Sequence, residues 1–355
     1  MKGKKALSLI TSLAIVGVLL SGCGSGSTPG APSGAAKATF KDGMVTDVGG
    51  INDQSFNEGA WNGLQKFGQK NPGVQVKYLE SSQSSDYSPN LNQFASNNYN
   101  LVWAIGYLMA DAVKASAKAY PKVNFAIVDD SITPTPSNLT CVLFRAQESS
   151  FLVGYIAALK TKTDKVGFIG GVPGTVIDEF EYGFRAGVAY GAKELGKNIS
   201  VNVQYANSFS DASLGKAIAQ HMYAQGADII FAAAGNVGQG MIAEAKAENK
   251  LCEGVDMDQA KLAPNNVLTS ALKNVNDAVE LISQDVKEGK KVGGQTISYG
   301  LKDGGVGIPY TAQAIKMCGQ DVIDKAKKVQ QDIIDGKIVP PYNKATYNKY
   351  LTTLK

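Results

Sequence analysis

From residue 40 onward, short apolar runs alternate with longer segments that have helical periodicity. Ten apolar runs predict strands, at 43–45, 74–78, 101–105, 124–128, 141–144, 166–169, 200–205, 229–233, 254–257 and 267–271. The helices predicted between them cover 56–70, 87–97, 110–120, 179–195, 212–225, 238–247 and 275–287, and a last long pattern covers 312–338 and ends at Pro340-Pro341. Strands that alternate with helices predict an α/β fold with parallel sheets built from right-handed crossovers.

The strands fall into two sets of five, which predict two doubly wound parallel-sheet lobes joined by a hinge. We expect the first lobe to contain residues 38–146 and about 275–304, and the second to contain 147–274 and about 305–355. Single cores stop growing near roughly 250–300 residues, so a chain of 355 residues also favours more than one core. In open α/β sheets a ligand binds beyond the carboxyl ends of the strands. We therefore expect a binding cleft where the two sheets meet.

The N-terminal segment has the features of an export signal. Lys2, Lys4 and Lys5 precede an apolar run of 15 residues at 6–20, which is short for a membrane span of about 20 residues. The run ends in Leu-Ser-Gly followed by Cys23, which resembles a bacterial lipobox; a plain signal peptide is the alternative. We therefore expect a signal peptide at 1–22 and, at 23–37, a lipidated Cys23 with a flexible tether. This places the mature protein on the extracytoplasmic face of a bacterial cell membrane.

The charge balance argues against a nucleic-acid partner. The chain has 35 Lys and Arg against 31 Asp and Glu, and without Lys2, Lys4 and Lys5 the excess falls to one. Nucleic-acid binding usually needs a basic patch or stripe. The single histidine, His221, makes a Ser/His/Asp relay, a Cys/His pair or a multi-histidine metal site hard to build. We expect no catalytic residues, no metal and no cofactor.

Three cysteines follow the tether: Cys141, Cys252 and Cys318. Outside the cytoplasm one pair of them could be oxidised. Cys141 lies in an apolar stretch and is expected to be a small buried hydrophobic residue. Whether Cys252 and Cys318 form a disulfide stays open.

Aromatic and acidic residues follow the predicted strands of the first lobe. Phe56 and Asn57 stand at the start of the first helix, where either Asp53 or Ser55 can act as the N-cap. A flat ring beside an amide suits a planar ligand with polar edges. The fourth strand is followed by Asp129 and Asp130, of which Asp129 is expected to hold a loop or a helix end.

The second lobe has a comparable set after its own strands. Phe209 follows the second strand there, and Gly235 follows the third, where a small residue lets a ligand approach the backbone. Asp256 ends the fourth strand and Lys273 follows the fifth. The alternatives are ordinary ones, because Phe209 could be a core aromatic and Lys273 a solvated surface charge.

Four segments resemble the basic membrane lipoprotein family: 43–63 (GMVTDVGGINDQSFNEGAWNG), 180–188 (FEYGFRAGV), 226–231 (GADIIF) and 254–259 (GVDMDQ). The resemblance implies a two-lobed, type I periplasmic-binding-protein-like lipoprotein. Such a protein binds purine nucleosides and delivers them to an ABC permease that has a separate ATPase. A monomer is expected. At 178–179 this chain has Asp-Glu, where the family often carries an arginine pair.

The resemblance also implies roles for individual residues. Phe56 and Phe209 would stack on the base. Contacts to base or ribose would come from Asp47, Asn57 and Asp130 in the first lobe and from Gly235, Asp256 and Lys273 in the second, with Phe180 as a further candidate. The acids would repel phosphate, which favours nucleosides over nucleotides. The alternatives are another flat ligand such as riboflavin, a signalling lipoprotein that acts on a sensor kinase, and an exported nucleoside hydrolase.

Overall fold

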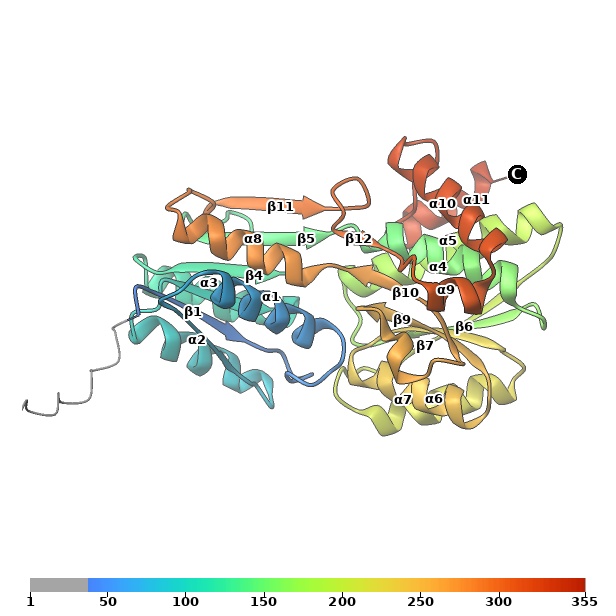
Figure 1. Cartoon of the computed structure of the whole chain (residues 1–355), viewed down its shortest axis with the longest axis horizontal. Coiled ribbons are helices and arrows are strands. Elements are labelled where there is room, and N and C mark those ends of the chain that lie inside the picture. The colour runs from blue at the N-terminus through green and yellow to red at the C-terminus, as the bar shows by residue number, and fades with distance from the viewer. Residues whose placement is uncertain (1–37, 355) are drawn as a thin grey trace, which may run out of the picture. The chain divides into compact units, whose positions relative to one another are not determined.

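A computed structural model describes residues 38–354, which contain two six-stranded sheets (Figure 1). The first sheet has the order β11-β5-β4-β3-β1-β2, and all its neighbouring strands are parallel. Its strands are β1 (Phe40–Val45), β2 (Val74–Leu79), β3 (Leu101–Ile105), β4 (Asn124–Val128), β5 (Leu139–Phe144) and β11 (Gln295–Tyr299).

The second sheet has the order β12-β10-β9-β8-β6-β7 and is parallel except for the pair β10–β12. Its strands are β6 (Lys165–Gly170), β7 (Ser200–Tyr205), β8 (Ile229–Ala233), β9 (Leu251–Asp256), β10 (Val267–Lys273) and β12 (Val306–Gly307). The chain passes between the two sheets after β5, after β10 and after β11.

Helices pack on both sheets, and each sheet with its helices is called a lobe below. The first lobe holds α1 (Phe56–Lys70), α2 (Tyr87–Ser96), α3 (Ala110–Ala119) and α8 (Val275–Lys287), with the 3-10 helices η1 (Ser84–Asp86) and η2 (Tyr107–Met109). The second holds α4 (Ala146–Lys160), α5 (Thr175–Leu195), α6 (Ala212–Ala224), α7 (Asn236–Ala247), α9 (Ala312–Cys318), α10 (Gln320–Ile334) and α11 (Lys344–Thr353), with the 3-10 helix η3 (Gln259–Leu262).

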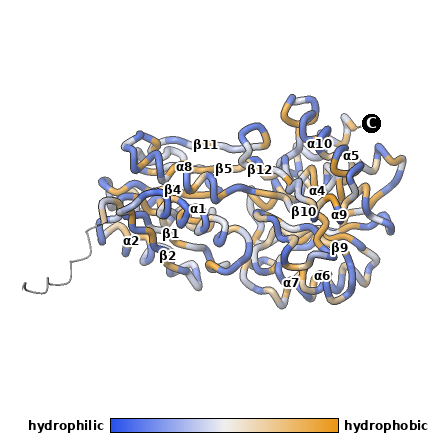
Figure 2. The backbone as a smooth tube through the Cα atoms, in the orientation of Figure 1, coloured by the Kyte–Doolittle hydropathy of each residue, from blue (hydrophilic) through white to orange (hydrophobic). Residues whose placement is uncertain are grey.

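The central strands are buried on both faces. Every residue of β3 and β8 is buried, which explains why these strands are continuous apolar runs in the sequence. Figure 2 shows hydrophobic stretches along β9, β10 and α4 in the second lobe. There α4 and α5 approach closely at glycines: a Cβ on Gly154 would lie 2.1 Å from the carbonyl oxygen of Phe184, and one on Gly187 would lie 2.0 Å from that of Phe151.

The predicted elements are present, with ends that differ by up to four residues, but one predicted helix is wrong and several elements are not predicted. The pattern at 312–338 is two helices, because Gly319 takes a φ of 95° and interrupts it. The sequence pattern does not predict α4, because residues 149–158 are all buried and the helix has no polar face to give it a period. The short edge strands β11 and β12 and the terminal helix α11 are also not predicted.

The predicted signal peptide, Cys23 and the tether lie outside the described part of the chain. Between residues 38 and 354, no helix is both long enough and apolar enough to cross a membrane.

Candidate functional site

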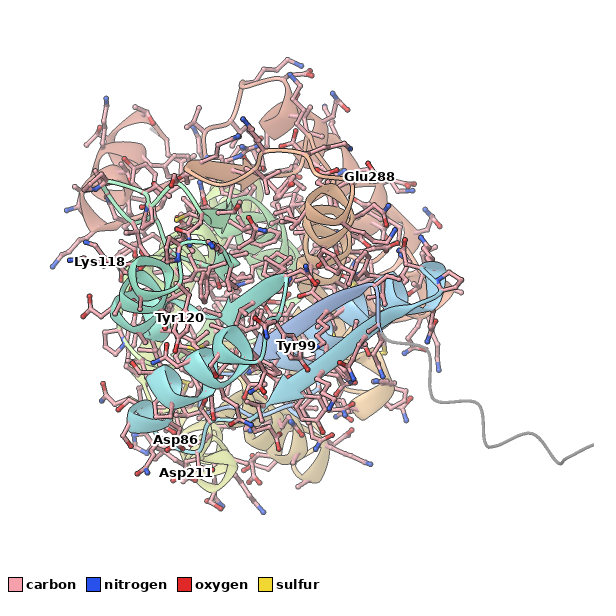
Figure 3. The ribbon with its side chains drawn as sticks, turned by 90° about the vertical axis from the view of Figure 1, so that its left-hand side faces the viewer. Asp86, Tyr99, Lys118, Tyr120, Asp211 and Glu288 are labelled. Atoms are coloured by element: carbon pink, nitrogen blue, oxygen red, sulfur yellow. The ribbon has the colours of Figure 1, made fainter. Side chains whose placement is uncertain are left out.

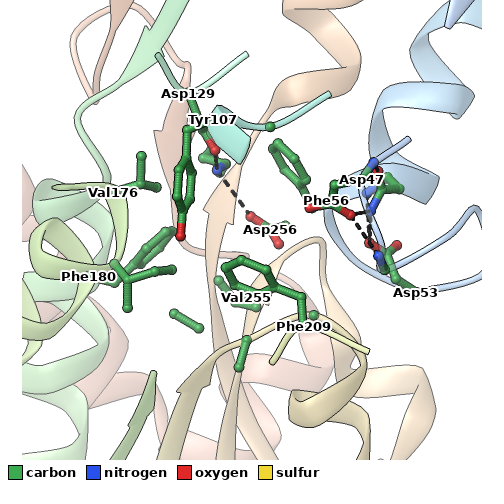
Figure 4. A pocket seen from close by; sticks show the side chains of 18 residues that line it. Asp47, Asp53, Phe56, Tyr107, Asp129, Val176, Phe180, Phe209, Val255 and Asp256 are labelled. Atoms are coloured by element: carbon green, nitrogen blue, oxygen red, sulfur yellow. Dashed lines mark hydrogen bonds and ion pairs between the residues drawn. The ribbon is translucent and has the colours of Figure 1, made fainter. Parts of the chain in front are cut away.

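A pocket with an empty volume of about 500 Å³ lies between the carboxyl ends of the two sheets (Figure 4). The first lobe lines it with Asp47, Gly49, Asp53, Phe56, Asn57, Gly106, Tyr107 and Asp129, and the second with Val176, Ile177, Phe180, Phe209, 233–235, Val255, Asp256 and Lys273. The structure thus brings seven of the eight predicted first-rank site residues, and Phe180, around one pocket.

Asp53 holds the start of α1. Its carboxylate accepts hydrogen bonds from the backbone N–H groups of Ser55 (3.0 Å), Asn57 (2.8 Å) and Glu58 (3.0 Å). Of the two predicted N-cap residues, Asp53 therefore satisfies the first N–H groups of the helix, while the Ser55 side chain makes no cap hydrogen bond. Ser55 Oγ instead donates to Asp256 Oδ2 of the second lobe, at 2.5 Å.

Asn57 positions two carboxylates. Its Nδ2 donates to Asp47 Oδ1 (2.8 Å) and to Asp53 Oδ2 (3.0 Å), and its Oδ1 accepts from the Asp47 backbone N–H (3.2 Å). Both amide hydrogens of Asn57 are therefore used inside the first lobe. Asp47 Oδ1 also accepts from the Gly49 N–H at 2.8 Å, so both side-chain hydrogen bonds of Asp47 go to Oδ1. Oδ2 is the oxygen that remains for a ligand.

Burial controls the protonation of Asp47. It raises the pKa of this carboxyl to about 6, although the hydrogen bonds from Asn57 and Gly49 favour the ionised form. Asp47 is therefore mainly ionised at neutral pH, and it can accept a hydrogen bond from a ligand O–H or N–H group.

Lys273 is a buried cation that joins the two lobes. It ends β10 and is 4% exposed. Its Nζ lies 2.5 Å from Asp129 Oδ2 of the first lobe and 3.8 Å from Asp256 Oδ1 of the second. Burial alone would lower the pKa of Lys273, but the charges of Asp129 and Asp256 outweigh it and raise this pKa above its ordinary value. Lys273 is thus a charged group of the pocket and not the surface lysine that was the alternative.

The surroundings of Lys273 are otherwise acidic. Burial raises the pKa of Asp256 to about 6, against the opposing effect of the Lys273 charge. Burial, and then the charge of Asp129, raise the pKa of Glu179 on α5 to about 8. Glu179 is therefore mainly neutral at pH 7. The four aspartates of the lining (Asp47, Asp53, Asp129 and Asp256) still outnumber its single cation, Lys273, so the pocket disfavours an anionic ligand.

Asp130 is the one predicted first-rank site residue that the structure does not bring to the pocket. It is absent from the lining of the pocket, and its carboxylate accepts from the Ser131 N–H at 2.7 Å. The pocket is lined by Asp129 instead. Asp129 has a φ of 70°, in the left-handed region, directly after β4, so the chain turns at this residue. The sequence does not reveal that turn, which decides which of the two acids reaches the pocket.

Aromatic rings from both lobes line the pocket. Phe56, the first residue of α1, lies with its ring centroid 4.4 Å from Lys273 Nζ. Phe209 is half-buried at the mouth of the second lobe, and Phe180 is buried on α5. Sequence reasoning missed Tyr107, whose ring lies edge-on to that of Phe209 with 6.3 Å between centroids. The only sequence signal was its place directly after β3 and Gly106.

Gly235 is required by the backbone. Its φ of 56° favours glycine, and a Cβ there would lie 2.9 Å from the carbonyl oxygen of Phe209. That carbonyl also accepts from the Asn236 N–H at 2.9 Å. Gly235 therefore lets the segment that carries Phe209 lie against the start of α7.

The structure gives no sign of metal or disulfide chemistry in residues 38–354. No cluster of three or more His, Cys, Asp or Glu side chains suited to a metal ion is found in this range. Cys141, Cys252 and Cys318 are each buried and unpaired, which leaves the bridge considered between Cys252 and Cys318 unformed here. Burial raises the pKa of the Cys252 thiol and raises that of Cys318 to about 12, so both are poor nucleophiles.

Comparison with known proteins gives consistent matches over nearly the whole chain. The chain is 42% identical over 360 residues to the CD4+ T-cell-stimulating antigen of Listeria monocytogenes, covering 95% of this chain and 99% of that protein. It is 40% identical over 359 residues to the ABC transporter nucleoside-binding protein BmpA of Lactococcus lactis, with the same coverage.

A crystal structure of an ABC transporter solute-binding protein from Aeropyrum pernix K1 superposes with a TM-score of 0.79 and 26% identity, covering 89% of this chain and 97% of that one. The fold is thus that of type I periplasmic-binding-protein-like solute-binding proteins. Residues 40–344 also match a family model, Bmp, described as "ABC transporter substrate-binding protein PnrA-like", which is a family of solute-binding proteins. The chain belongs to the Bmp family of PnrA-like ABC transporter substrate-binding proteins.

Proposed function

We propose that this protein is a lipid-anchored extracytoplasmic receptor for purine nucleosides. It captures guanosine, adenosine or inosine between its lobes and delivers the nucleoside to an ABC permease with a separate ATPase. The observation that carries the proposal is the pairing of an aromatic ring from each lobe, Phe56 and Phe209, with the open carboxylate oxygen of Asp47 in one pocket.

The chemistry of the pocket suits a neutral, flat ligand with hydrogen-bond donors. Stacking of a base on an aromatic side chain contributes about 1–3 kcal/mol in single-strand nucleic-acid binding, so two rings supply several kcal/mol. Carboxylates accept hydrogen bonds from ribose hydroxyls and from base N–H groups. A nucleotide would bring its phosphate close to Asp47, Asp129 and Asp256, which disfavours it.

The similarity to a named relative supports the same ligand class. The Lactococcus lactis protein is named a nucleoside-binding protein, and it aligns with 95% of this chain. The anchor rests on the sequence alone: the lipobox-like residues 20–23 follow a signal-like segment. Two acyl chains or an equivalent second signal are needed for durable attachment, which lipidation of Cys23 would supply.

Closure of the lobes is the step that would hold the ligand. Hydrogen bonds already join the lobes around the pocket: Asn236 Nδ2 donates to the Gly49 carbonyl (2.7 Å), and Gln259 Nε2 donates to the Gln54 carbonyl (3.0 Å). Hinge bending at the three connections between the sheets would break and remake these contacts. The closed, loaded form is the one the permease would receive.

A binding panel on refolded protein tests the proposal. The protein is unfolded and refolded first, so that a ligand carried from the expression host does not mask binding. Thermal unfolding and calorimetry then compare guanosine, adenosine and inosine with their monophosphates, free bases, riboflavin and sugars. A ligand at about 100 times its Kd stabilises the fold by about 2.7 kcal/mol. We expect stabilisation by purine nucleosides and little by the monophosphates.

Two other results would replace the proposal. Stabilisation by riboflavin or a sugar, without any by nucleosides, would keep the fold and change the ligand. Release of free base from inosine by the purified protein would indicate a hydrolase, provided that the activity is lost in the variants Asp47→Asn and Asp256→Asn prepared in the same way.

A further inference from the structure

Tyr107 reaches from the first lobe to the second at the edge of the pocket. It opens η2 directly after β3 and Gly106, which has a φ of 115°. Its hydroxyl donates a hydrogen bond of 2.8 Å to the backbone carbonyl of Val172, in the loop between β6 and α5. A side chain of the first lobe is thereby tied to the backbone of the second.

The ring of Tyr107 fits between two parts of the second lobe. It meets the Phe209 ring edge-on, at 6.3 Å between centroids and 82° between planes (Figure 4). On another side it lies against Gly174, where an added Cβ would come within 3.1–3.3 Å of the phenol ring and its oxygen. A larger residue than glycine at 174 would push the ring away.

The loop that Tyr107 contacts leads into the pocket wall. Residues 171–174 connect β6 to α5, and Val176, Ile177 and Phe180 of α5 line the pocket. The same loop is close to Phe209, because a Cβ on Gly171 would lie 2.1 Å from that ring. One tyrosine therefore contacts both the loop before α5 and the ring proposed to stack on the base.

The hydroxyl of Tyr107 remains a hydrogen-bond donor at physiological pH. Burial, and then the negative charges of Asp129 and Asp47, raise the pKa of Tyr107 well above its ordinary value. The carbonyl of Val172 can only accept, so the direction of the hydrogen bond is fixed.

We propose that Tyr107 is a positioning residue that latches the closed cleft, and that it sets how slowly the ligand leaves. The hydroxyl holds the 171–174 loop, and the ring holds Phe209 in place. The latch forms only when the lobes are closed, so its loss acts on opening and ligand release and not on encounter. This inference rests on the proposed function, since the released ligand is taken to be a nucleoside.

The test compares two tyrosine-to-phenylalanine variants. Tyr107→Phe removes only the hydroxyl that crosses between the lobes. Tyr223→Phe is the matched control, because the Tyr223 hydroxyl donates to the Leu251 carbonyl at 2.9 Å entirely within the second lobe. Stopped-flow fluorescence measures association of guanosine and its release into excess competitor for each variant and for the wild type.

We expect the rate constant of release to rise about 2- to 12-fold in Tyr107→Phe, which corresponds to the loss of one hydrogen bond, while association stays within about twofold. Tyr223→Phe should lower thermal stability without changing release. Unchanged release in Tyr107→Phe, or an equal change in Tyr223→Phe, would overturn the latch.

A second measurement separates the latch from the identity of the ligand. Lys118 on the outer side of α3 (Figure 3) and Lys246 on α7 are both exposed, and each is replaced by cysteine for spin labelling in a Cys23→Ser chain. The remaining cysteines are buried. If the wild type binds no nucleoside, the proposed function fails, but Tyr107→Phe should still reduce the population at the short interlobe distance. Identical distance distributions would refute the latch itself.

Discussion

Replacement of Lys273 by methionine tests whether the closed cleft depends on its single buried cation. Methionine keeps an unbranched apolar chain but removes the charge that lies 2.5 Å from Asp129 and 3.8 Å from Asp256. The side chains of Lys273 and Asp129 are 3% and 6% exposed, so the carboxylates would be left buried without a counter-charge. Removal of one partner from a buried ion pair costs about 3–5 kcal/mol.

Protonation limits this cost. An aspartate carboxyl with an ordinary pKa of about 3.9 can be neutralised at pH 7 for about 4 kcal/mol, since each pH unit corresponds to about 1.4 kcal/mol. Burial already raises the pKa of Asp256 to about 6 while Lys273 is present, so the removal of Lys273 favours the neutral form of Asp256 further. At pH 5 the same neutralisation costs only about 1.5 kcal/mol.

The loss should appear in affinity more than in the stability of the free protein. Asp129 belongs to the first lobe and Lys273 to the second sheet, so opening of the cleft lets water solvate the carboxylate. We expect Lys273→Met to weaken guanosine binding at pH 7 by roughly 10²–10³-fold, corresponding to about 3–4 kcal/mol. At pH 5 the loss of guanosine affinity relative to the wild type should be only roughly 10-fold, because protonation of a carboxylate then costs about 1.5 kcal/mol.

Calorimetric titrations at pH 5 and 7 measure both numbers, with Lys66→Met as the control. Lys66, whose side chain is 48% exposed, pairs with Glu280 at 2.7 Å away from the pocket, so the loss of this pair should leave affinity unchanged. The double variant Lys273→Met/Asp129→Asn should recover part of the affinity, because it leaves no unpaired charge at Asp129. A Lys273→Met protein that binds within a few-fold of the wild type at pH 7, or whose loss is larger at pH 5, would refute this reasoning.

Three further predictions concern the pocket and the core. Phe56→Ala and Phe209→Ala should each weaken guanosine binding by about 1–3 kcal/mol in calorimetry, and an equal affinity in both variants and the wild type would argue against stacking. Burial raises the pKa of Glu253 well above its ordinary value, so the wild-type protein loses stability as the pH rises above about 4.5, where the unfolded chain releases this proton. Denaturant unfolding should therefore show the stability of Glu253→Gln rising relative to that of the wild type by up to about 1.4 kcal/mol per pH unit. Parallel pH profiles of the two proteins would contradict this. Gly187→Ala should lower the melting temperature, because its Cβ would lie 2.0 Å from the Phe151 carbonyl oxygen, and an unchanged melting temperature would show that α4 and α5 can separate at little cost.

The sequence was most informative about strands and about residues that directly follow them. β3 and β8 are continuous apolar runs because both faces of a parallel sheet are covered, and their bounds agree with the prediction. Phe56 and Asp256 could be predicted as pocket residues for a related reason: the ends of parallel strands meet at one edge of each sheet. Helix α4 could not be predicted in this way, because a helix buried all round has no amphipathic period.

The choice between neighbouring side chains depended on tertiary structure. Asp129 and Asp130 are chemically identical in sequence, and only the left-handed turn at Asp129 decides that it meets Lys273. Asn57 was expected to contact the ligand, but both its amide hydrogens are used to hold Asp47 and Asp53. Tyr107 was missed because its partner, the Val172 carbonyl, is 65 residues away and belongs to the other lobe.

The most direct test of the account is a titration of refolded protein with guanosine and with guanosine monophosphate under the same conditions. The pocket joins rings from both lobes with several acids and one cation, so the account predicts saturable, one-to-one binding of the nucleoside and binding of the monophosphate at least 10-fold weaker, a difference of about 1.4 kcal/mol. Equal or tighter binding of the monophosphate, or no binding of any purine nucleoside, would contradict it.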